Sequence, residues 1–279
     1  MTDASSKPDR YAVMGHPIGH SWSPFIHGMF ARQTGQNLTY RMLDVPPEKF
    51  RVSALEFFTT GGRGLNITVP HKPAAAEFVN RLTARAEAAG AVNTILVEAN
   101  GELLGDNTDG VGLLTDLTTN LGLRIAGLRI LILGAGGATR GVLGPLLDAR
   151  PATLTIANRT PARAAELVQD FSKPGTLTGC GFDEIPHEEP WDLLINATSA
   201  SLQGAAPLVS PDIVSARTIC YDMAYGKGDT SFTRWAREHG AARTVKGWGM
   251  LVEQAAESFH LWRGVRPDTQ PVLAALQAN

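Results

Sequence analysis

Residues 128–141 read LRILILGAGGATRG, an apolar run followed by glycines and then by the start of a helix. The length and branched side chains of Arg129 to Leu133 predict a buried strand of a parallel sheet. Residues 139–147 predict a helix with one apolar face. Between the two elements stand Gly134, Gly136 and Gly137. Strand, glycine turn and helix together form the unit that binds a dinucleotide pyrophosphate on backbone N–H groups and a helix N-terminus.

The glycine turn matches the dinucleotide fingerprint incompletely, because Thr139 stands at the third position of G-x-G-x-x-G. A glycine-rich turn that only packs is the alternative. The next expected strand, 153–157, ends at Asn158 and Arg159, and Arg163 follows one helical turn later. NAD sites place an acidic residue about 20 positions past the glycines, whereas a guanidinium suits a 2′-phosphate. We therefore predict NADP as the cofactor, against the alternative that both arginines are ordinary surface cations.

The composition is that of a globular protein of two domains, with 279 residues, 43% of them hydrophobic and 19% charged. A formal net charge of −2 offers no basic surface for nucleic acid or an anionic membrane. Cys180 and Cys220 are not at metal-ligand spacing and predict neither a zinc site nor a disulfide framework. The first residues, MTDASSKPDR, contain no apolar segment typical of a secretion signal. We therefore expect a cytoplasmic protein without a bound metal.

A loop rich in glycine and proline, GHPIGHSWSP, covers residues 15–24. Ser21 and Ser23 point to the same side of an extended backbone, where they offer two hydroxyls to one ligand. The alternative is that Ser23 caps the helix expected at 24–34, with Pro24 at its first position. From this loop alone, the capping interpretation is favoured.

The expected strand GLNITV leads toward a lysine. Asn66 and Thr68 alternate on one face of this strand, and Lys72 follows just before a helix expected at 74–82. Pro73 at the first helical position makes Lys72 the expected N-cap. A helix N-terminus disfavours an ammonium group, so that a lysine there can act as a proton acceptor. The alternative is a solvated surface lysine, which is the more common case. Three polar groups converging at the carboxyl end of a strand predict a ligand site.

Further polar positions interrupt or follow apolar segments. Asn93 lies inside the strand expected at 90–97, where a buried amide must find partners in the protein or in a ligand. Asp109 lies in the cluster DNTDG before the helix expected at 111–120, either as its cap or as a functional group. Thr198 follows the apolar strand LLIN, at the edge where open α/β sheets bind ligands.

Strands and helices alternate along the chain, which predicts an α/β fold. We expect an N-terminal substrate domain with a mixed, mostly parallel sheet, and a Rossmann-like NADP-binding domain. Leu251, Ala255, Phe259 and Trp262 recur at helical spacing, and this last helix is expected to pack back on the first domain. Residues 245–250, VKGWGM, are expected as a glycine-bearing turn. The expected boundaries are 1–108 with 247–279 for the substrate domain and 109–246 for the NADP-binding domain.

A set of motifs extends from about Tyr11 to the C-terminal helix. They read GHPIGHSWSPFIH, NITVPHK, AGAVNT, GDNTDG, GAGGATRG, ANRT, INATS, YDMAY and GMLVEQA. Their combination resembles the shikimate dehydrogenase family of the aromatic amino-acid pathway. The resemblance implies a two-domain fold and the reversible reduction of 3-dehydroshikimate to shikimate with NADPH.

The resemblance also implies roles for individual positions. Lys72 and Asp109 are implied as the catalytic pair around the hydroxyl that is oxidised, and Ser21 and Ser23 as the hydroxyls that bind the substrate carboxylate. The substrate site is completed by Asn66, Thr68, Asn93, Tyr225 and Gln254. The implied cofactor-binding residues are Gly134, Ala135, Gly136, Gly137, Ala138, Asn158, Arg159, Thr160, Arg163, Thr198, Met223 and Gly247.

Two positions depart from the family pattern and bear only on secondary contacts. Ala84 stands where some members have a glutamate, and Lys246 where relatives often have an acid.

The nearest alternative is a quinate/shikimate dehydrogenase using NAD or NADP, which Arg159 disfavours. A non-catalytic sensor would have lost Lys72 or Asp109. The expected partners are shikimate and 3-dehydroshikimate, the expected assembly is a monomer or homodimer, and which member of the pair moves the proton stays open.

Overall fold

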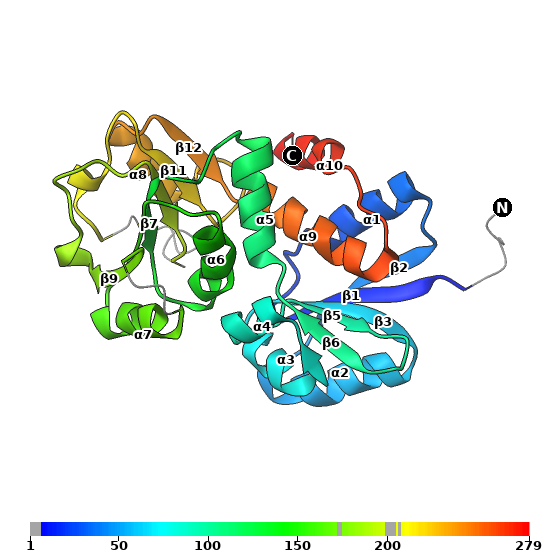
Figure 1. Ribbon diagram of the computed structural model, residues 1–279. Helices are drawn as coiled ribbons and strands as arrows, with labels where there is room; N and C mark the ends of the chain where they lie inside the picture. The colour runs from blue at the N-terminus through cyan, green and yellow to red at the C-terminus, as the bar shows by residue number, and fades with distance from the viewer. Residues whose placement is uncertain (1–6, 172–174, 199–204, 206–207, 279) are drawn as a thin grey trace. The chain divides into compact units, whose positions relative to one another are not determined.

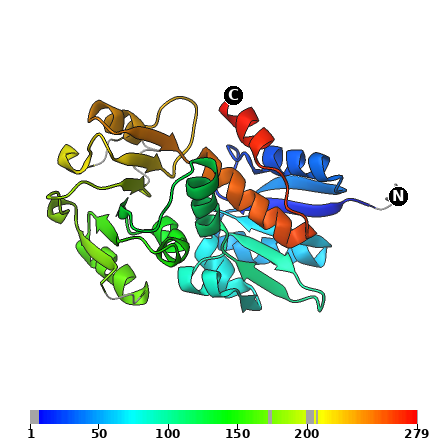
Figure 2. The same cartoon turned by 45° about the horizontal axis from the view of Figure 1, so that its top comes forward.

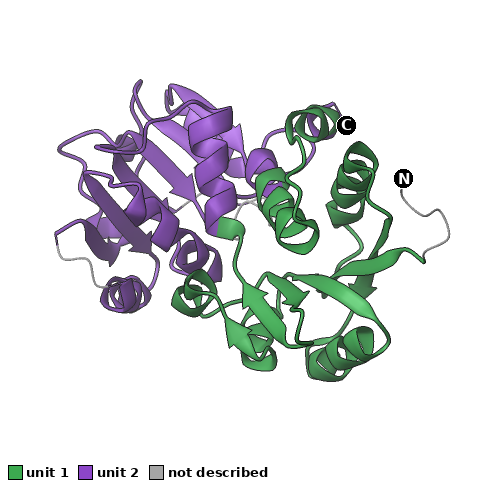
Figure 3. Ribbon diagram, turned by 45° about the vertical axis from the view of Figure 1, so that its right-hand side comes forward, with its two compact units in different colours: residues 1–109, 252–275 green, residues 110–251, 276–279 purple. Residues whose placement is uncertain are grey.

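The computed structural model describes residues 7–171, 175–198, 205 and 208–278. The chain forms two compact units (Figure 3): unit 1 comprises residues 1–109 and 252–275, and unit 2 comprises residues 110–251 and 276–279. These bounds differ from the expected ones, because Asp109 belongs to unit 1 while residues 247–251 and 276–279 belong to unit 2. The chain passes from one unit to the other after residue 109 and after residue 251. Both points lie inside helices, where no turn or change of composition marks a boundary. Among the described residues, no helix has the length and apolarity needed to cross a bilayer.

Unit 1 contains a mixed six-stranded sheet in the order β2-β1-β3-β5-β6-β4. Its strands are β1 (Asp9–Gly15), β2 (Leu38–Asp44), β3 (Gly62–Ile67), β4 (Arg81–Leu82), β5 (Thr94–Val97) and β6 (Leu103–Asp106). β1 runs parallel to β2 and β3, whereas β5 is antiparallel to both β3 and β6. Gly101, at φ +87°, lies in the turn between β5 and β6, where glycine adopts the left-handed backbone conformation without strain. The sheet is therefore mixed, as expected.

Helices cover both faces of this sheet (Figures 1 and 2). The helices of unit 1 are α1 (Ser23–Thr34), the short η1 (Pro47–Lys49), α2 (Phe50–Thr59), α3 (Lys72–Phe78) and α4 (Ala84–Ala89). Helices α9 (Trp248–Arg263) and α10 (Gln270–Gln277) belong partly to unit 1 and partly to unit 2. Side chains of β1 alternate between the faces. Ala12 and Met14 join one buried cluster with Ala54 of α2, while Tyr11 packs against Trp262 of α9 in a tilted arrangement, with ring centroids 4.7 Å apart. Residues 252–263 of the last long helix thus pack on unit 1, as expected.

Unit 2 contains an all-parallel six-stranded sheet in the order β12-β11-β10-β7-β8-β9. Its strands are β7 (Arg129–Leu133), β8 (Thr153–Asn158), β9 (Leu177–Gly181), β10 (Leu193–Asn196), β11 (Ile219–Asp222) and β12 (Arg243–Lys246). Its helices are α5 (Asp109–Thr115), which continues into the π-helical η2 (Asp116–Asn120), α6 (Gly137–Asp148), α7 (Pro161–Phe171), α8 (Ser231–Glu238), and the short η3 (Phe182–Glu184) and η5 (Pro211–Ile213).

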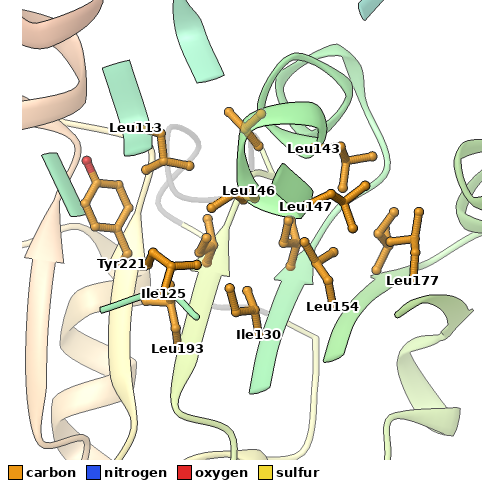
Figure 4. Close-up of a cluster of buried hydrophobic side chains, with 14 of the residues drawn as sticks. Leu113, Ile125, Ile130, Leu143, Leu146, Leu147, Leu154, Leu177, Leu193 and Tyr221 are labelled. Carbon is orange, nitrogen blue, oxygen red and sulfur yellow. The ribbon is translucent and has the colours of Figure 1, made fainter. Parts of the chain in front are cut away.

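The core of unit 2 lies between the sheet and its helices. On one face, leucines of α6 such as Leu143 and Leu146 meet Ile130 of β7 and Leu154 of β8, as Figure 4 shows. On the other face, Phe232 of α8 packs with a second cluster of strand residues. The strands are apolar on both faces because both are covered, which is the pattern of a doubly wound parallel sheet.

Several elements differ from the sequence expectation. β9 and β12 were not expected as strands, and residues 245–250 were expected as one turn although β12 extends to Lys246 and α9 starts at Trp248. The helix expected at 74–82 ends at Phe78, because residues 81–82 pair with β6 instead. Helix α10 was not expected. In residues 81–82, pairing with a strand distant in sequence outweighs the local helical pattern, and this pairing cannot be read from the sequence alone.

Candidate active site

Lys72 and Asp109 meet in unit 1. The Lys72 Nζ donates to Asp109 Oδ2 at 2.5 Å, and the two side chains are 25% and 11% exposed. Lys72 is the first residue of α3 and His71 is the N-cap, so the expectation of Lys72 as N-cap is wrong by one position. The carboxylate compensates the ammonium at this helix N-terminus, which on its own disfavours a positive charge.

Asp109 does not cap its helix. It is the first residue of α5, and its backbone N–H donates to Asn107 Oδ1 at 3.1 Å. Its carboxylate turns toward other side chains: Oδ2 accepts from Lys72, and Oδ1 accepts from Asn93 Nδ2 at 2.8 Å. The capping interpretation is therefore wrong, and Asp109 serves as a buried acceptor for two polar side chains.

Asn93 is a buried residue directly before β5, and its side chain forms hydrogen bonds with the loop before α5. Its Oδ1 accepts from the backbone N–H of Thr108 at 2.9 Å, while its Nδ2 donates to Thr108 Oγ1 at 2.9 Å and lies 3.5 Å from Gln254 Oε1. The buried amide thus finds the partners that the sequence demanded. Gln254 of α9 joins the same group of side chains.

Asn66 and Thr68 occupy the end of β3. Asn66 is buried, and its Oδ1 accepts from Tyr40 at 2.7 Å while its Nδ2 faces Ser258 Oγ at 3.1 Å. Thr68 is partly exposed, and its backbone N–H donates to Met14 at 3.0 Å. Asn66 therefore joins the polar side chains at the end of β3, and Thr68 follows directly after that strand.

Ser21 and Ser23 lie at the N-terminus of α1. Ser23 is the first helical residue and the N-cap is Trp22, so the favoured expectation that Ser23 caps the helix is wrong. Instead, Ser21 Oγ accepts from the Ser23 backbone N–H at 3.3 Å. The hydroxyl of Ser23, on a largely buried residue, forms a hydrogen bond with the Tyr40 phenol.

The glycine turn of unit 2 has the shape that phosphate binding needs. Gly134 adopts φ +105°, and a Cβ there would lie 3.0 Å from Thr198 Cγ2. Gly136 is the N-cap of α6, and no atom crowds a Cβ at Gly136 or Gly137, so the approach to the helix N-terminus is open. Thr139 occupies the third fingerprint position, buried, with its hydroxyl donated to Gly134 O at 2.7 Å. This hydrogen bond stabilises the glycine turn. The third glycine of the fingerprint, which Thr139 replaces, would form no such bond.

A hollow of about 220 Å³ adjoins this turn. Its lining comprises Ala135, Gly136, Gly137, Arg140, Arg163, Glu166 and Leu167. Ala138 lies in the first turn of α6 behind it. The helix N-terminus and two guanidinium groups make the hollow suitable for an anion, apart from the carboxylate of Glu166. Arg140 was missed by sequence reasoning, although its place one turn after the glycines was a usable signal.

The end of β8 is held to the glycine turn by Asn158. Its Oδ1 accepts from Ala135 N–H at 3.2 Å, and its Nδ2 donates to Thr160 O at 2.9 Å. Arg159 and Arg163 are exposed. Arg163 lines the hollow beside the glycine turn, and Arg159 follows directly after β8.

The remaining residues that the resemblance implies for the cofactor follow β10, β11 and β12. Asn196 Nδ2 donates to the buried Asp222 Oδ1 at 3.0 Å, and Asn196 Oδ1 accepts from the Thr198 hydroxyl at 2.7 Å. Gly247 is required by close approach, since a Cβ there would lie 2.3 Å from Met223 O. Thr198, Met223 and Gly247 are thus held in unit 2 at the carboxyl ends of the strands.

Tyr225 follows β11 and belongs to unit 2, unlike the other expected substrate residues. Its ring packs on Trp248 with centroids 4.9 Å apart. Burial raises the pKa of the Tyr225 phenol, so its hydroxyl remains a hydrogen-bond donor at neutral pH. Within unit 1, hydrogen bonds link Ser23, Asn66, Lys72, Asn93, Asp109 and Gln254 through residues that sequence reasoning missed, namely Tyr40, Thr94, Thr108 and Ser258.

Three family models match successive parts of the chain. They describe the shikimate dehydrogenase substrate binding domain over residues 13–95, shikimate / quinate 5-dehydrogenase over residues 116–207, and the shikimate 5′-dehydrogenase C-terminal domain over residues 247–277. The chain is also 56% identical to the shikimate dehydrogenase (NADP(+)) of Alkalilimnicola ehrlichii, over 96% of this chain and 98% of that protein. The chain belongs to the shikimate dehydrogenase family.

Solved structures of similar proteins agree with this assignment to the shikimate dehydrogenase family. An Ael1 enzyme from Pseudomonas putida matches with a TM-score of 0.91 and 44% identity, covering 96% of this chain and 98% of that one. A shikimate 5-dehydrogenase from Thermus thermophilus, described in complex with NADP(H) and shikimate, matches with a TM-score of 0.84 and 33% identity, covering 97% and 99%.

Lys246, one of the two departures noted above, has a defined role in this member of the shikimate dehydrogenase family. Its Nζ donates to Gly228 O at 2.7 Å and to Gly226 O at 3.2 Å. The ammonium group thereby closes the loop that follows Tyr225. Ala84, the other departure, is the first residue of α4, where Thr83 caps the helix by accepting from Ala86 N–H.

An ion pair supports the loop that carries Asp109. Arg85 donates to both oxygens of Asp106 at 2.6 Å, and these side chains are 28% and 2% exposed. Burial acts to raise the pKa of the Asp106 carboxyl, but hydrogen bonds from Arg85 and Thr83 and the charge of Arg85 outweigh it, so the pKa lies below its usual value. Asp106 Oδ1 also accepts from Asn107 N–H at 2.7 Å, which shapes the turn before Asp109.

Replacing Arg85 by methionine is expected to lower the free energy of unfolding by about 3 kcal/mol at pH 7, because it leaves a buried carboxylate without its partner. A group with a depressed folded pKa stabilises above its unfolded pKa, and this contribution is lost as pH falls through the folded pKa. The difference in the free energy of unfolding between the variant and the unmodified protein should therefore shrink below about pH 4. Urea unfolding at several pH values measures this difference. Arg81→Met, which breaks an exposed pair with Glu98, is the control and should cost less than about 1 kcal/mol.

Proposed function

We propose that this protein catalyses the reversible reduction of 3-dehydroshikimate to shikimate with NADPH, with unit 1 binding the substrate and unit 2 the cofactor. The observation that carries the proposal is the buried Lys72–Asp109 pair, held by Asn93, in a member of the shikimate dehydrogenase family. Ser21 and Ser23 are assigned to the substrate carboxylate, and Asn66, Thr68, Asn93, Tyr225 and Gln254 to the remaining substrate oxygens.

On the substrate side, Lys72 is the group that we assign to proton transfer at the reacting oxygen. Both oxygens of Asp109 already accept hydrogen bonds, one from Lys72 and one from Asn93. The Lys72 ammonium has three N–H groups, and among the described residues Asp109 takes one of them. In the reductive direction the Lys72 ammonium donates a proton to the oxygen as negative charge develops on it and becomes a neutral amine. In the oxidative direction the neutral amine accepts the hydroxyl proton and becomes the ammonium. Asp109 orients Lys72 and compensates its charge.

On the cofactor side, the residues present fit NADP. The glycine turn and the N-terminus of α6 suit the pyrophosphate, and Asn158, Arg159, Thr160 and Arg163 suit the adenosine 2′-phosphate. Bound NADPH supplies the hydride for the reduction. Thr198, Met223 and Gly247 are assigned to the nicotinamide half, because they follow the carboxyl ends of the neighbouring strands.

Replacing Arg159 by alanine is expected to raise the KM for NADP about 10- to 100-fold, since a charge-assisted hydrogen bond to the 2′-phosphate is lost. The KM for NAD should stay within about twofold, because NAD lacks that phosphate. Steady-state kinetics with both cofactors measure the change. Arg243→Ala removes another exposed arginine of unit 2 and should leave both KM values as they are. An equal rise with both cofactors would show that Arg159 does not read the 2′-phosphate.

The function itself is tested by following the formation of reduced nicotinamide by the purified protein. Four mixtures are compared: shikimate with NADP, shikimate with NAD, quinate with NADP and quinate with NAD. Turnover of shikimate with NADP supports the proposal. Turnover of quinate with NAD would contradict it in favour of a quinate/shikimate dehydrogenase. Tight NADP binding without turnover of either substrate would indicate a sensor or another substrate.

We also propose a cytoplasmic protein that works as a monomer or homodimer. Cys180 and Cys220 are both unoxidised thiols, and Cys220 is buried. This arrangement suits a reducing compartment. Light scattering measures the assembly state directly, and a larger oligomer would contradict the proposal.

A further inference from the structure

A series of hydrogen bonds crosses unit 1 from Tyr40 to Asp109. The Tyr40 hydroxyl donates to Asn66 Oδ1 at 2.7 Å, and Asn66 Nδ2 donates to Thr94 Oγ1 at 3.2 Å. Thr94 then donates to Asn93 Oδ1 at 2.9 Å, and Asn93 Nδ2 donates to Asp109 Oδ1 at 2.8 Å. We call these five residues the donor chain, because every link donates toward Asp109.

Backbone groups fix the orientation of the two amides in the donor chain. Asn66 Nδ2 also faces the carbonyl oxygen of Asn93 at 3.3 Å, and a carbonyl can only accept. Asn93 Oδ1 also faces the backbone N–H of Thr108 at 2.9 Å, and an N–H can only donate. Neither amide can therefore be turned over without opposing two donors or two acceptors.

The phenol at the start of the donor chain cannot reverse it either. The Tyr40 ring stacks on His27 with centroids 4.3 Å apart and planes 6° from parallel. Burial raises the pKa of the Tyr40 phenol well above its usual value, although the hydrogen bond with Ser23 opposes this, so the hydroxyl keeps its proton. Burial also lowers the pKa of His27 to about 3, so no positive charge faces the ring at neutral pH.

Thr94 stands at the centre of this arrangement. It is the hydroxyl between the two oriented amides, it is completely buried, and it also lies 2.7 Å from Ser258 Oγ. The Thr94 hydroxyl accepts from Asn66 Nδ2 and donates to Asn93 Oδ1. Together with the backbone N–H of Thr108, it holds the Asn93 amide where Nδ2 faces Asp109. Hydrogen bonds aligned in one direction strengthen one another, and an anion at the accepting end favours this alignment.

We propose that Thr94 is a positioning residue, whose hydroxyl orients the Asn93 amide and through it the Asp109 carboxylate that holds Lys72. The inference deepens the proposed function and rests on it for its catalytic consequence. Its structural part, the orientation of Asn93 by Thr94, stands independently.

Thr94→Val tests the inference, because valine keeps the shape of threonine and removes only the hydroxyl. We expect kcat for shikimate oxidation to fall about tenfold, since Asn66 and Asn93 both lose a buried partner. The KM for NADP should not change. Thr94→Ser restores the hydroxyl and should recover most of kcat. Thr155→Val is the matched control, because Thr155 is a buried strand threonine of unit 2 that shares a hydrogen bond of 2.8 Å with Thr178.

A double-mutant cycle and a crystal structure complete the test. In an Asn93→Ala background, Thr94→Val should have less than about a third of its effect on log kcat, because its route to Asp109 is gone. In the crystal structure of Thr94→Val, the Asn93 amide should be displaced, so that Asn93 Nδ2 lies farther from Asp109 Oδ1 than its present 2.8 Å. An undisplaced amide with unchanged kcat would overturn the inference while leaving the proposed function intact. A displaced amide in a protein that never oxidises shikimate would support the positioning and overturn the proposed function.

Discussion

Lys72→Met is expected to lower kcat for shikimate oxidation by about 10²- to 10⁴-fold, because methionine keeps the length of the side chain but cannot donate or accept a proton. The KM for NADP should change little, since the residues assigned to the cofactor belong to the other compact unit. Stopped-flow and steady-state measurement of NADPH formation give both numbers.

The matched control for Lys72 is Lys49→Met, which removes an exposed lysine of the same unit at the end of η1. Its kcat should equal that of the unmodified protein. A loss of less than about tenfold in Lys72→Met would contradict proton transfer by Lys72 and leave catalysis to the positioning of the substrate.

Asp109→Asn is expected to lower kcat by about 10²- to 10³-fold without unfolding the protein. The carboxylate accepts on both oxygens, from Lys72 Nζ and from Asn93 Nδ2, and both of these groups can only donate. An asparagine has one acceptor oxygen, so one of its sides presents an N–H to another N–H. Either Lys72 or Asn93 then loses its orientation, and the charge that compensates the ammonium is lost as well.

The same assay, combined with thermal unfolding, measures the effect of Asp109→Asn. Glu77→Gln is the control, because it makes the same chemical change at an exposed position on the helix that begins with Lys72. If Asp109→Asn kept kcat within about fivefold, the pair would not act as a unit and the assignment of Asp109 would be wrong.

The elements that sequence reasoning placed most accurately are the central ones. The bounds of β7 and β10 agree with the expected ones, because central strands of a parallel sheet are covered on both faces and are therefore continuously apolar. Two strands of this sheet that were missed, β9 and β12, are its edges. An edge strand has one neighbour and several exposed residues, so LTGCG and RTVK carry little of the apolar signal.

The candidate site divides in a similar way. Lys72, Asp109 and Asn93 were found because each places a polar group next to an apolar element, and the structure brings them together. Tyr40 and Ser258 were missed, since their importance comes from meeting Asn66 across the sheet, far from it in sequence. Periodicity reports which face a residue occupies, but it does not report which residue of another element it meets.

Unit 1 is assembled from two separate parts of the chain, and this has a consequence for synthesis on the ribosome. Residues 110–251 are translated between them, which delays the second part by an interval on the order of ten seconds. During that interval β1 and β3 exist without Trp262, whose indole in the finished protein packs on Tyr11 and donates to Ile95 O at 3.0 Å. The nascent chain therefore lacks the indole that covers this part of the sheet until residue 262 has been synthesised.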